Sequence, residues 1–237
     1  MLLLAIWQVA ALCIKSTVLI ASPLAVLKRL LTIWREDSFF KSISFSFVRI
    51  AGGFIIAFFT GIILAIPAGR FEWFEIMMSP LMVTIKSVPV ASFIIIALMW
   101  LSSKQLSIFI SFLMVLPVIY SNVLQGIKST DTKLLEMADV FRLSYGKRFK
   151  YIWLPSIKPF LLSAAHVSLG MAWKSGVAAE VIGIPSGSIG ENLYEAKAYF
   201  NTVDLFAWTV IIVLISVVFE KVCILLLKKF FEHLENE

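Results

Sequence analysis

QGIKSTDTKLLEMADVFRLSYGKRFKYIWLPSIK, residues 125–158, is a basic, polar segment with long hydrophobic runs on both sides. A connection of this length is too long to be a turn. Its apolar residues recur at helical spacing: Leu134, Leu135, Ala138 and Phe141. This pattern predicts a short amphipathic helix. The residues alone fit a solvated basic loop and a docking site for a cytoplasmic protein equally well.

The composition of the chain is that of a membrane protein. Of the 237 residues, 60% are hydrophobic and 15% are charged, and the mean hydropathy is +0.94. Soluble domains carry about 45–50% apolar and about 25% charged residues. The net charge of +6 is explained by membrane topology, so we expect no nucleic-acid partner. Cys13 and Cys223 lie in apolar runs and are expected to be buried free thiols.

Hydrophobic runs long enough to cross a bilayer predict about six spans. They cover residues 2–21, 42–68, 80–100, 106–124, 159–183 and 204–227. The first run is interpreted as a retained span rather than a cleaved signal peptide. We therefore expect an all-α, polytopic transmembrane bundle that forms a single domain over residues 1–237.

The basic residues orient this bundle. Segment 125–158 carries Lys128, Lys133, Arg142, Lys147, Arg148, Lys150 and Lys158. The positive-inside rule places it, and with it both termini, in the cytoplasm. Residues 22–41 then fall outside. Ser22 and Pro23 there begin a predicted amphipathic helix that rests on the membrane surface.

Charged residues within spans are functional candidates by default. His166, Trp173 and Glu180 share one helical face of the fifth predicted span, and Lys174 lies beside it. This face predicts a lining for the translocation path between two copies of the chain. The alternative is that Glu180 lies near the outer surface and pairs with a basic residue, for which Arg49 is a candidate.

Other patterns predict packing or turns rather than chemistry. Gly53, Ala57, Gly61, Ala65 and Gly69 form a small-residue stripe for close helix packing, and Ser168, Ala172 and Gly176 form another. Lys86 can snorkel from the end of its span.

The glycines after Ile184 lack the lysine of a phosphate loop, so they predict a turn into an outer helix. No catalytic or metal-binding pattern is recognisable, and we expect no enzyme, no cofactor and no ATP site in this chain.

The polar segment resembles the signature loop of binding-protein-dependent permeases. That loop reads Glu-Ala-Ala, three residues, Gly, nine residues, Ile, any residue, Leu-Pro. Glu136, Ala138, Ile152, Leu154 and Pro155 match it in register. Two positions depart from it: Met137 replaces an alanine, and Arg142 occupies the glycine position, which puts the shape of the turn in doubt.

Further residues resemble the nitrate, sulfonate and taurine branch of these ATP-binding-cassette (ABC) permeases. They are Arg49 with Gly52-Gly53-Phe54, Val88-Pro89, Pro117 with Asn122 and Gly126, Ala172-Trp173-Lys174, and Ala178-Ala179-Glu180. The resemblance implies the type I importer fold in a bacterial inner membrane. It also implies a homodimer of permeases, two ATPase subunits below and a substrate-binding protein outside. Finally, it implies that the loop inserts a helix into the ATPase through Leu135, Glu136, Met137, Ala138, Phe141 and Arg142.

The competing hypothesis is a stand-alone secondary transporter or channel. Such a protein needs no cytoplasmic docking helix and often shows internal inverted repeats. No convincing repeat is visible here, and the long polar loop favours the ATPase-driven importer. The sequence does not name the solute; the resemblance suggests a small organic solute or an oxyanion.

Overall fold

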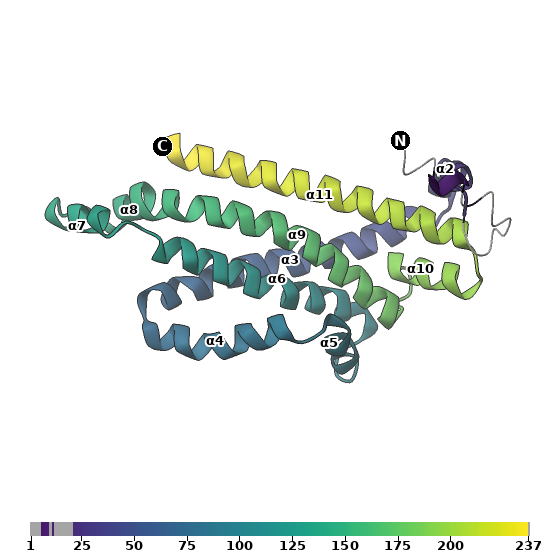
Figure 1. Cartoon of the computed structure of the whole chain (residues 1–237), viewed down its shortest axis with the longest axis horizontal. Helices are drawn as coiled ribbons and strands as arrows, with labels where there is room; N and C mark the ends of the chain where they lie inside the picture. The colour runs from purple at the N-terminus through teal and green to yellow at the C-terminus, as the bar shows by residue number, and fades with distance from the viewer. Residues whose placement is uncertain (1–5, 10, 12–20, 237) are drawn as a thin grey trace.

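The computed structural model describes residues 6–9, 11 and 21–236, and the described chain is an elongated bundle of helices (Figure 1). Most of the predicted span at 2–21 lies outside the described residues. The all-α expectation is confirmed. The helices in chain order are α2 (Pro23–Leu30), α3 (Phe39–Arg70), α4 (Glu72–Ser87), α5 (Val90–Ala97), α6 (Ser103–Lys128), α7 (Thr132–Val140), α8 (Tyr145–Arg148), α9 (Leu154–Gly183), α10 (Ile189–Ala198) and α11 (Thr202–Asn236).

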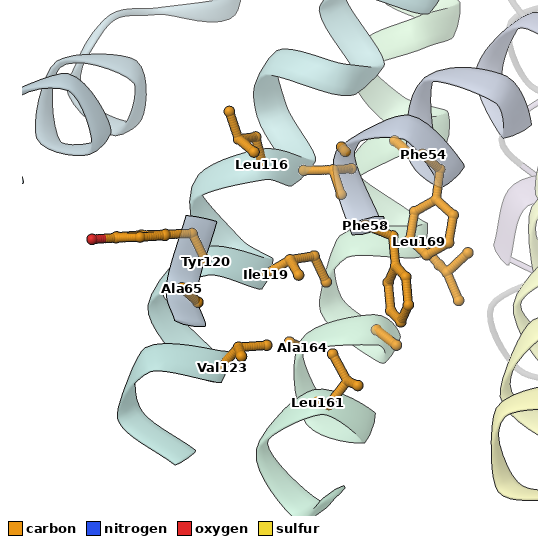
Figure 2. Packing of buried hydrophobic residues seen from close by; sticks show 14 of the residues in the cluster. Phe54, Phe58, Ala65, Leu116, Ile119, Tyr120, Val123, Leu161, Ala164 and Leu169 are labelled. Atoms are coloured by element: carbon orange, nitrogen blue, oxygen red, sulfur yellow. The ribbon is translucent and has the colours of Figure 1, made fainter. Parts of the chain in front are cut away.

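The core of the bundle is a layer of three long helices, in which α6 packs against both α3 and α9. The small-residue stripe of α3 faces α6, as predicted. A Cβ atom on Gly53 would lie 2.4 Å from the carbonyl oxygen of Ile108, and one on Gly61 would lie 2.9 Å from Ile119. Figure 2 shows the result, with Ala65 of α3 and Ala164 of α9 close to Ile119 of α6. Small residues thus let the backbones approach closely in the absence of a hydrophobic driving force.

The third predicted span, 80–100, is wrong as a single straight helix. The chain bends by 100° between α4 and α5, at Val88-Pro89. Val88 is extended, with ψ of 131°, because the ring of a following proline disfavours the helical conformation. Pro89 then begins α5. The pair is a broken span or a re-entrant hairpin rather than a rod.

Pro155 and Pro159 flank the point where the chain re-enters the membrane, a position at which proline is expected to interrupt a helix, yet the helix here is continuous. Helical structure runs unbroken from α8 through a π-helical stretch, Phe149–Trp153, into α9. Pro155 is the second residue of α9 and has no N–H to continue the helical series of hydrogen bonds. The π-helical stretch just before it, in which the Leu154 N–H bonds the Phe149 carbonyl, accommodates this gap.

Three described helices are long and apolar enough to cross a membrane: α3, α6 and α11. The bent pair α4–α5 adds a fourth candidate. The 30-residue helix α9 has the length of a span and packs along α6, but Ser, His, Lys and Glu side chains make it less apolar. Only 17% of the apolar window of α11 is buried, so most of the apolar surface of this helix is exposed on the single chain.

The two ends of the bundle differ in character. Helices α7 and α8 lie at one end, together with the C-terminus of α11, and α2 and α10 lie at the other (Figure 1). Helix α2 begins at Pro23, as predicted, and ends at Leu30; the chain then forms one 3-10 turn, Ile33–Arg35, before α3 begins. Leu24, Leu27 and Leu31 of this region are more than half exposed, as expected of an amphipathic surface segment. Arg29 ties it to α11 through an ion pair with Asp204.

Candidate coupling helix and membrane face

Helix α7 is capped at both ends by its own sequence. The Asp131 carboxylate accepts the backbone N–H of Lys133 at 2.9 Å, which satisfies a free donor of the first turn. At the other end, Leu143 N–H donates to the Ala138 carbonyl and Arg142 N–H to the Asp139 carbonyl. These two bonds form a Schellman motif, in which the residue after the cap is left-handed. Arg142 is that residue, with φ of 50°.

The left-handed conformation of Arg142 falls at the position where the permease loop described above has glycine. Glycine adopts positive φ without steric cost. In this chain an arginine adopts positive φ, and the helix still ends in a Schellman turn.

Arg148 fixes the end of α7 from outside the helix, and sequence reasoning missed it. Its guanidinium donates to the Leu143 carbonyl at 3.0 Å and to the Ala138 carbonyl at 3.2 Å, and it pairs with Asp139 at 2.6 Å. Because Arg148 belongs to the helical extension of α9, these contacts join α7 to α9. The available signal was a basic residue shortly after a helix C-terminus, where side chains of this type bond the last carbonyls.

The predicted coupling residues divide between an inner and an outer face of α7. Met137 is 44% exposed and Phe141 is 71% exposed, and Glu136 is exposed beside them. Leu135 is half-buried. Ala138 is fully buried under the loop's own chain, so a bulky residue there would disturb the loop before it met a partner. The outward apolar side chains are Leu134, Met137, Val140 and Phe141.

The predicted path residues of α9 do not share one exposed face. His166 is exposed and its Nδ1 lies 3.1 Å from Glu220 Oε1 of α11, and Lys174 is exposed on the same side of α9. Trp173 is 1% exposed and packs among the rings of Phe47 and Phe219. The outward stripe of α9 therefore contains His166, Gly170 and Lys174, while Trp173 and Glu180 point into the protomer.

Glu180 connects three helices inside the protomer. Its carboxylate accepts the Ser46 hydroxyl of α3 at 2.6 Å and the Gly190 N–H of α10 at 3.4 Å. The Ser46 oxygen accepts the N–H of Ile189 at 2.9 Å. A carboxylate at a helix N-terminus interacts favourably with the helix dipole. Among the described residues Arg49 donates to the carbonyls of Phe45 and Lys104, and it does not bond Glu180.

These features define a class of protein. Long apolar helices surround a close-packed core, the described part of the chain gathers no cluster of metal ligands, and an amphipathic helix projects from one end. Such an arrangement is that of a helical membrane permease.

The comparison with known families agrees with this class. Residues 57–234 match the family described as binding-protein-dependent transport system inner membrane component, and the chain belongs to this family. It is the permease subunit of an ABC importer and not itself an enzyme. Permeases of this family act in the membrane with an ATPase subunit and a substrate-binding protein.

Named relatives cover much of the chain. A putative aliphatic sulfonates transport permease protein of Bacillus subtilis is 27% identical over 90% of this chain and 78% of its own length. A probable ABC transporter permease protein of Brucella melitensis is 30% identical over 80% of this chain and 77% of its own length. A bicarbonate transport system permease protein of Synechococcus elongatus is 27% identical over 65% of this chain and 55% of its own length.

Proposed function

We propose that this permease pairs with a second copy of itself, forms the path for a small solute, and receives the motion of its ATPase through α7. ATP is bound by the partner subunit in this proposal, and the chain carries no ATPase site of its own. The solute class is that of the named relatives, which are a sulfonate and a bicarbonate permease. Both of these solutes are small anions.

The observation that carries the coupling role is the exposed apolar face of α7. Leu134, Met137 and Phe141 follow one another at helical spacing and remain exposed at the end of the bundle. A helix that presents such residues suits a hydrophobic groove on a partner. Arg148 holds this helix against the extension of α9, so a displacement of α7 is transmitted to a core helix.

The proposed orientation has α7 and the C-terminus in the cytoplasm and α2 and α10 outside. The basic residues of segment 125–158 support it. The separation of α7 and the end of α11 from α2 and α10 is compatible with it (Figure 1). The binding protein then meets the α2–α10 end.

Cross-linking tests the docking role. Cysteine is placed at Met137 or, as a control at the opposite end, at Tyr199, which is 81% exposed. Both variants are expressed with the ATPase and treated with a short bifunctional thiol reagent. We expect a permease–ATPase adduct from Met137→Cys and none from Tyr199→Cys. An adduct from neither variant, or from both alike, contradicts the assignment.

A further inference from the structure

A cavity of about 270 Å³ lies between α4 and α6, outside the residues assigned above. Its polar lining residues are Glu75, Ser79, Lys86, Tyr120, Ser121, Gln125 and Lys128. The cavity is open at the surface of the protomer. Two ammonium groups and one carboxylate make its charged lining net positive.

The charges within the cavity are distributed unevenly. Lys128 Nζ is neutralised by Glu75, with both carboxylate oxygens at 2.6 Å. The space continues past Glu75 into a second hollow, which adds Glu72. Lys86 lies at the other end and bonds the hydroxyl of Ser121 at 2.8 Å. That partner is neutral, so the charge of Lys86 is not compensated by an ion pair among the described residues.

A second donor, the Tyr120 hydroxyl, lines the same cavity as Lys86. Tyr120 is 3% exposed, and its hydroxyl has no hydrogen-bond partner among the described residues. Its ring points away from the core side chains around Ile119 (Figure 2). A buried hydroxyl without a partner costs free energy unless a ligand or water satisfies it. An ammonium and a hydroxyl donor that line one cavity match the oxygens of a sulfonate, carboxylate or similar anion.

We propose that the Lys86 end of this cavity is an anion-binding site on the translocation route, with Lys86 and Tyr120 as the contacting residues. The proposal rests on the permease function above and deepens it by assigning residues that select a negatively charged solute. A cationic solute would be repelled by the positive charge of Lys86, which no ion pair among the described residues compensates. The Glu75–Lys128 pair neutralises the charge at the far end of the cavity, so the anion is held at Lys86 and not at Lys128.

Thiol modification tests this site without knowledge of the natural solute. The probes are sulfonatoethyl methanethiosulfonate, an anion, and trimethylammonioethyl methanethiosulfonate, a cation. Cysteine is introduced at Val83, which lines the cavity one helical turn before Lys86. The full chain carries Cys13→Ser and Cys223→Ser to remove its own thiols. The measurement is the ratio of the anionic to the cationic reaction rate in the purified membrane protein.

Lys86→Gln is expected to lower this ratio about tenfold, because one nearby unit charge in a partly screened site changes the local energy by at least about 1.4 kcal/mol. Lys86→Arg keeps the charge and is expected to keep the ratio. Lys104→Gln removes the same charge from the other end of α6 and is expected to leave the ratio unchanged. Tyr120→Phe removes only the hydroxyl and should lower the ratio by a smaller factor.

Three results overturn the site: an unchanged ratio in Lys86→Gln, an equal fall in Lys104→Gln, or no reaction of Val83→Cys with either probe. Copurification of the ATPase with the Val83→Cys chain is measured in parallel. If the ATPase copurifies but Lys86→Gln leaves the ratio of reaction rates unchanged, only the anion site is wrong. If the ratio depends on Lys86 but no ATPase binds, the anion site holds and the coupling function is wrong.

Discussion

At the scale of single residues, the turn after α7 depends on an arginine in a conformation that favours glycine. A left-handed conformation costs a residue with a Cβ roughly 1–2 kcal/mol. Arg142 bears that cost, and the Schellman bonds of Arg142 and Leu143 stabilise the turn in spite of it. The sequence alone revealed the departure from the family pattern but not the conformation, because backbone dihedrals are set by the hydrogen bonds around the turn.

Arg142→Gly is therefore expected to stabilise the end of α7. Relief of the left-handed strain, less the entropy that glycine loses on folding, leaves a gain of about 1 kcal/mol. The measurement is hydrogen exchange at the Leu143 amide, which should slow about fivefold. Arg142→Ala is the control, since it removes the charge and keeps the Cβ. Equal exchange in the glycine and alanine variants would show that Arg142 is not strained.

At the scale of helices, close packing depends on small residues at particular positions of α9. Gly176 faces the core: a Cβ there would lie 2.6 Å from Ile50 and 2.6 Å from the Ser111 hydroxyl oxygen. Gly170, on the same helix, has open space around it. The predicted packing seam of Ser168, Ala172 and Gly176 is confirmed by these contacts. Spacing found the seam, but it did not identify α3 and α6 as the helices that face it.

The two glycines make a matched pair of substitutions. Gly176→Ala should destabilise the protein by about 1–3 kcal/mol through overpacking. Gly170→Ala should be neutral or stabilising by up to about 1 kcal/mol, because alanine is the better helix former. Thermal unfolding of the two purified variants in one detergent compares them. A Gly176→Ala protein as stable as Gly170→Ala would mean that α9 does not pack against α3 and α6 in this register.

At the scale of the whole molecule, hydrophobic runs predicted the helical bundle and its long helices well. They did not reveal the bend at Val88-Pro89 or the continuous helix through Pro155, where proline has opposite consequences. Val88 is extended before Pro89 and the span bends there, whereas Pro155 follows a π-helical stretch that accommodates its missing N–H. Candidate path residues were harder to predict. Helical spacing in the sequence placed Trp173 and His166 on one face. In the folded protein Trp173 is buried and His166 is exposed.

The proposed orientation is testable in intact cells. Cysteine at Lys133 should resist a membrane-impermeant thiol reagent applied from outside and react in inverted vesicles, because the basic residues of segment 125–158 hold it in the cytoplasm. Cysteine at Tyr199 should behave in the opposite way. Ready labelling of Lys133→Cys from outside would reverse the topology and remove α7 from the reach of a cytoplasmic ATPase.

The central claim, that α7 is the docking element for the ATPase, is tested most directly by copurification of that subunit with the detergent-solubilised permease. Met137→Asp puts a charge into the exposed apolar face, and Glu136→Lys reverses a charge beside it. We predict that Met137→Asp lowers the amount of bound ATPase at least about tenfold, because desolvating a carboxylate in an apolar groove costs more than 1.4 kcal/mol. Glu136→Lys should lower it less, and Tyr199→Asp should leave it at the wild-type amount. Wild-type recovery of the ATPase with both α7 variants would contradict the account.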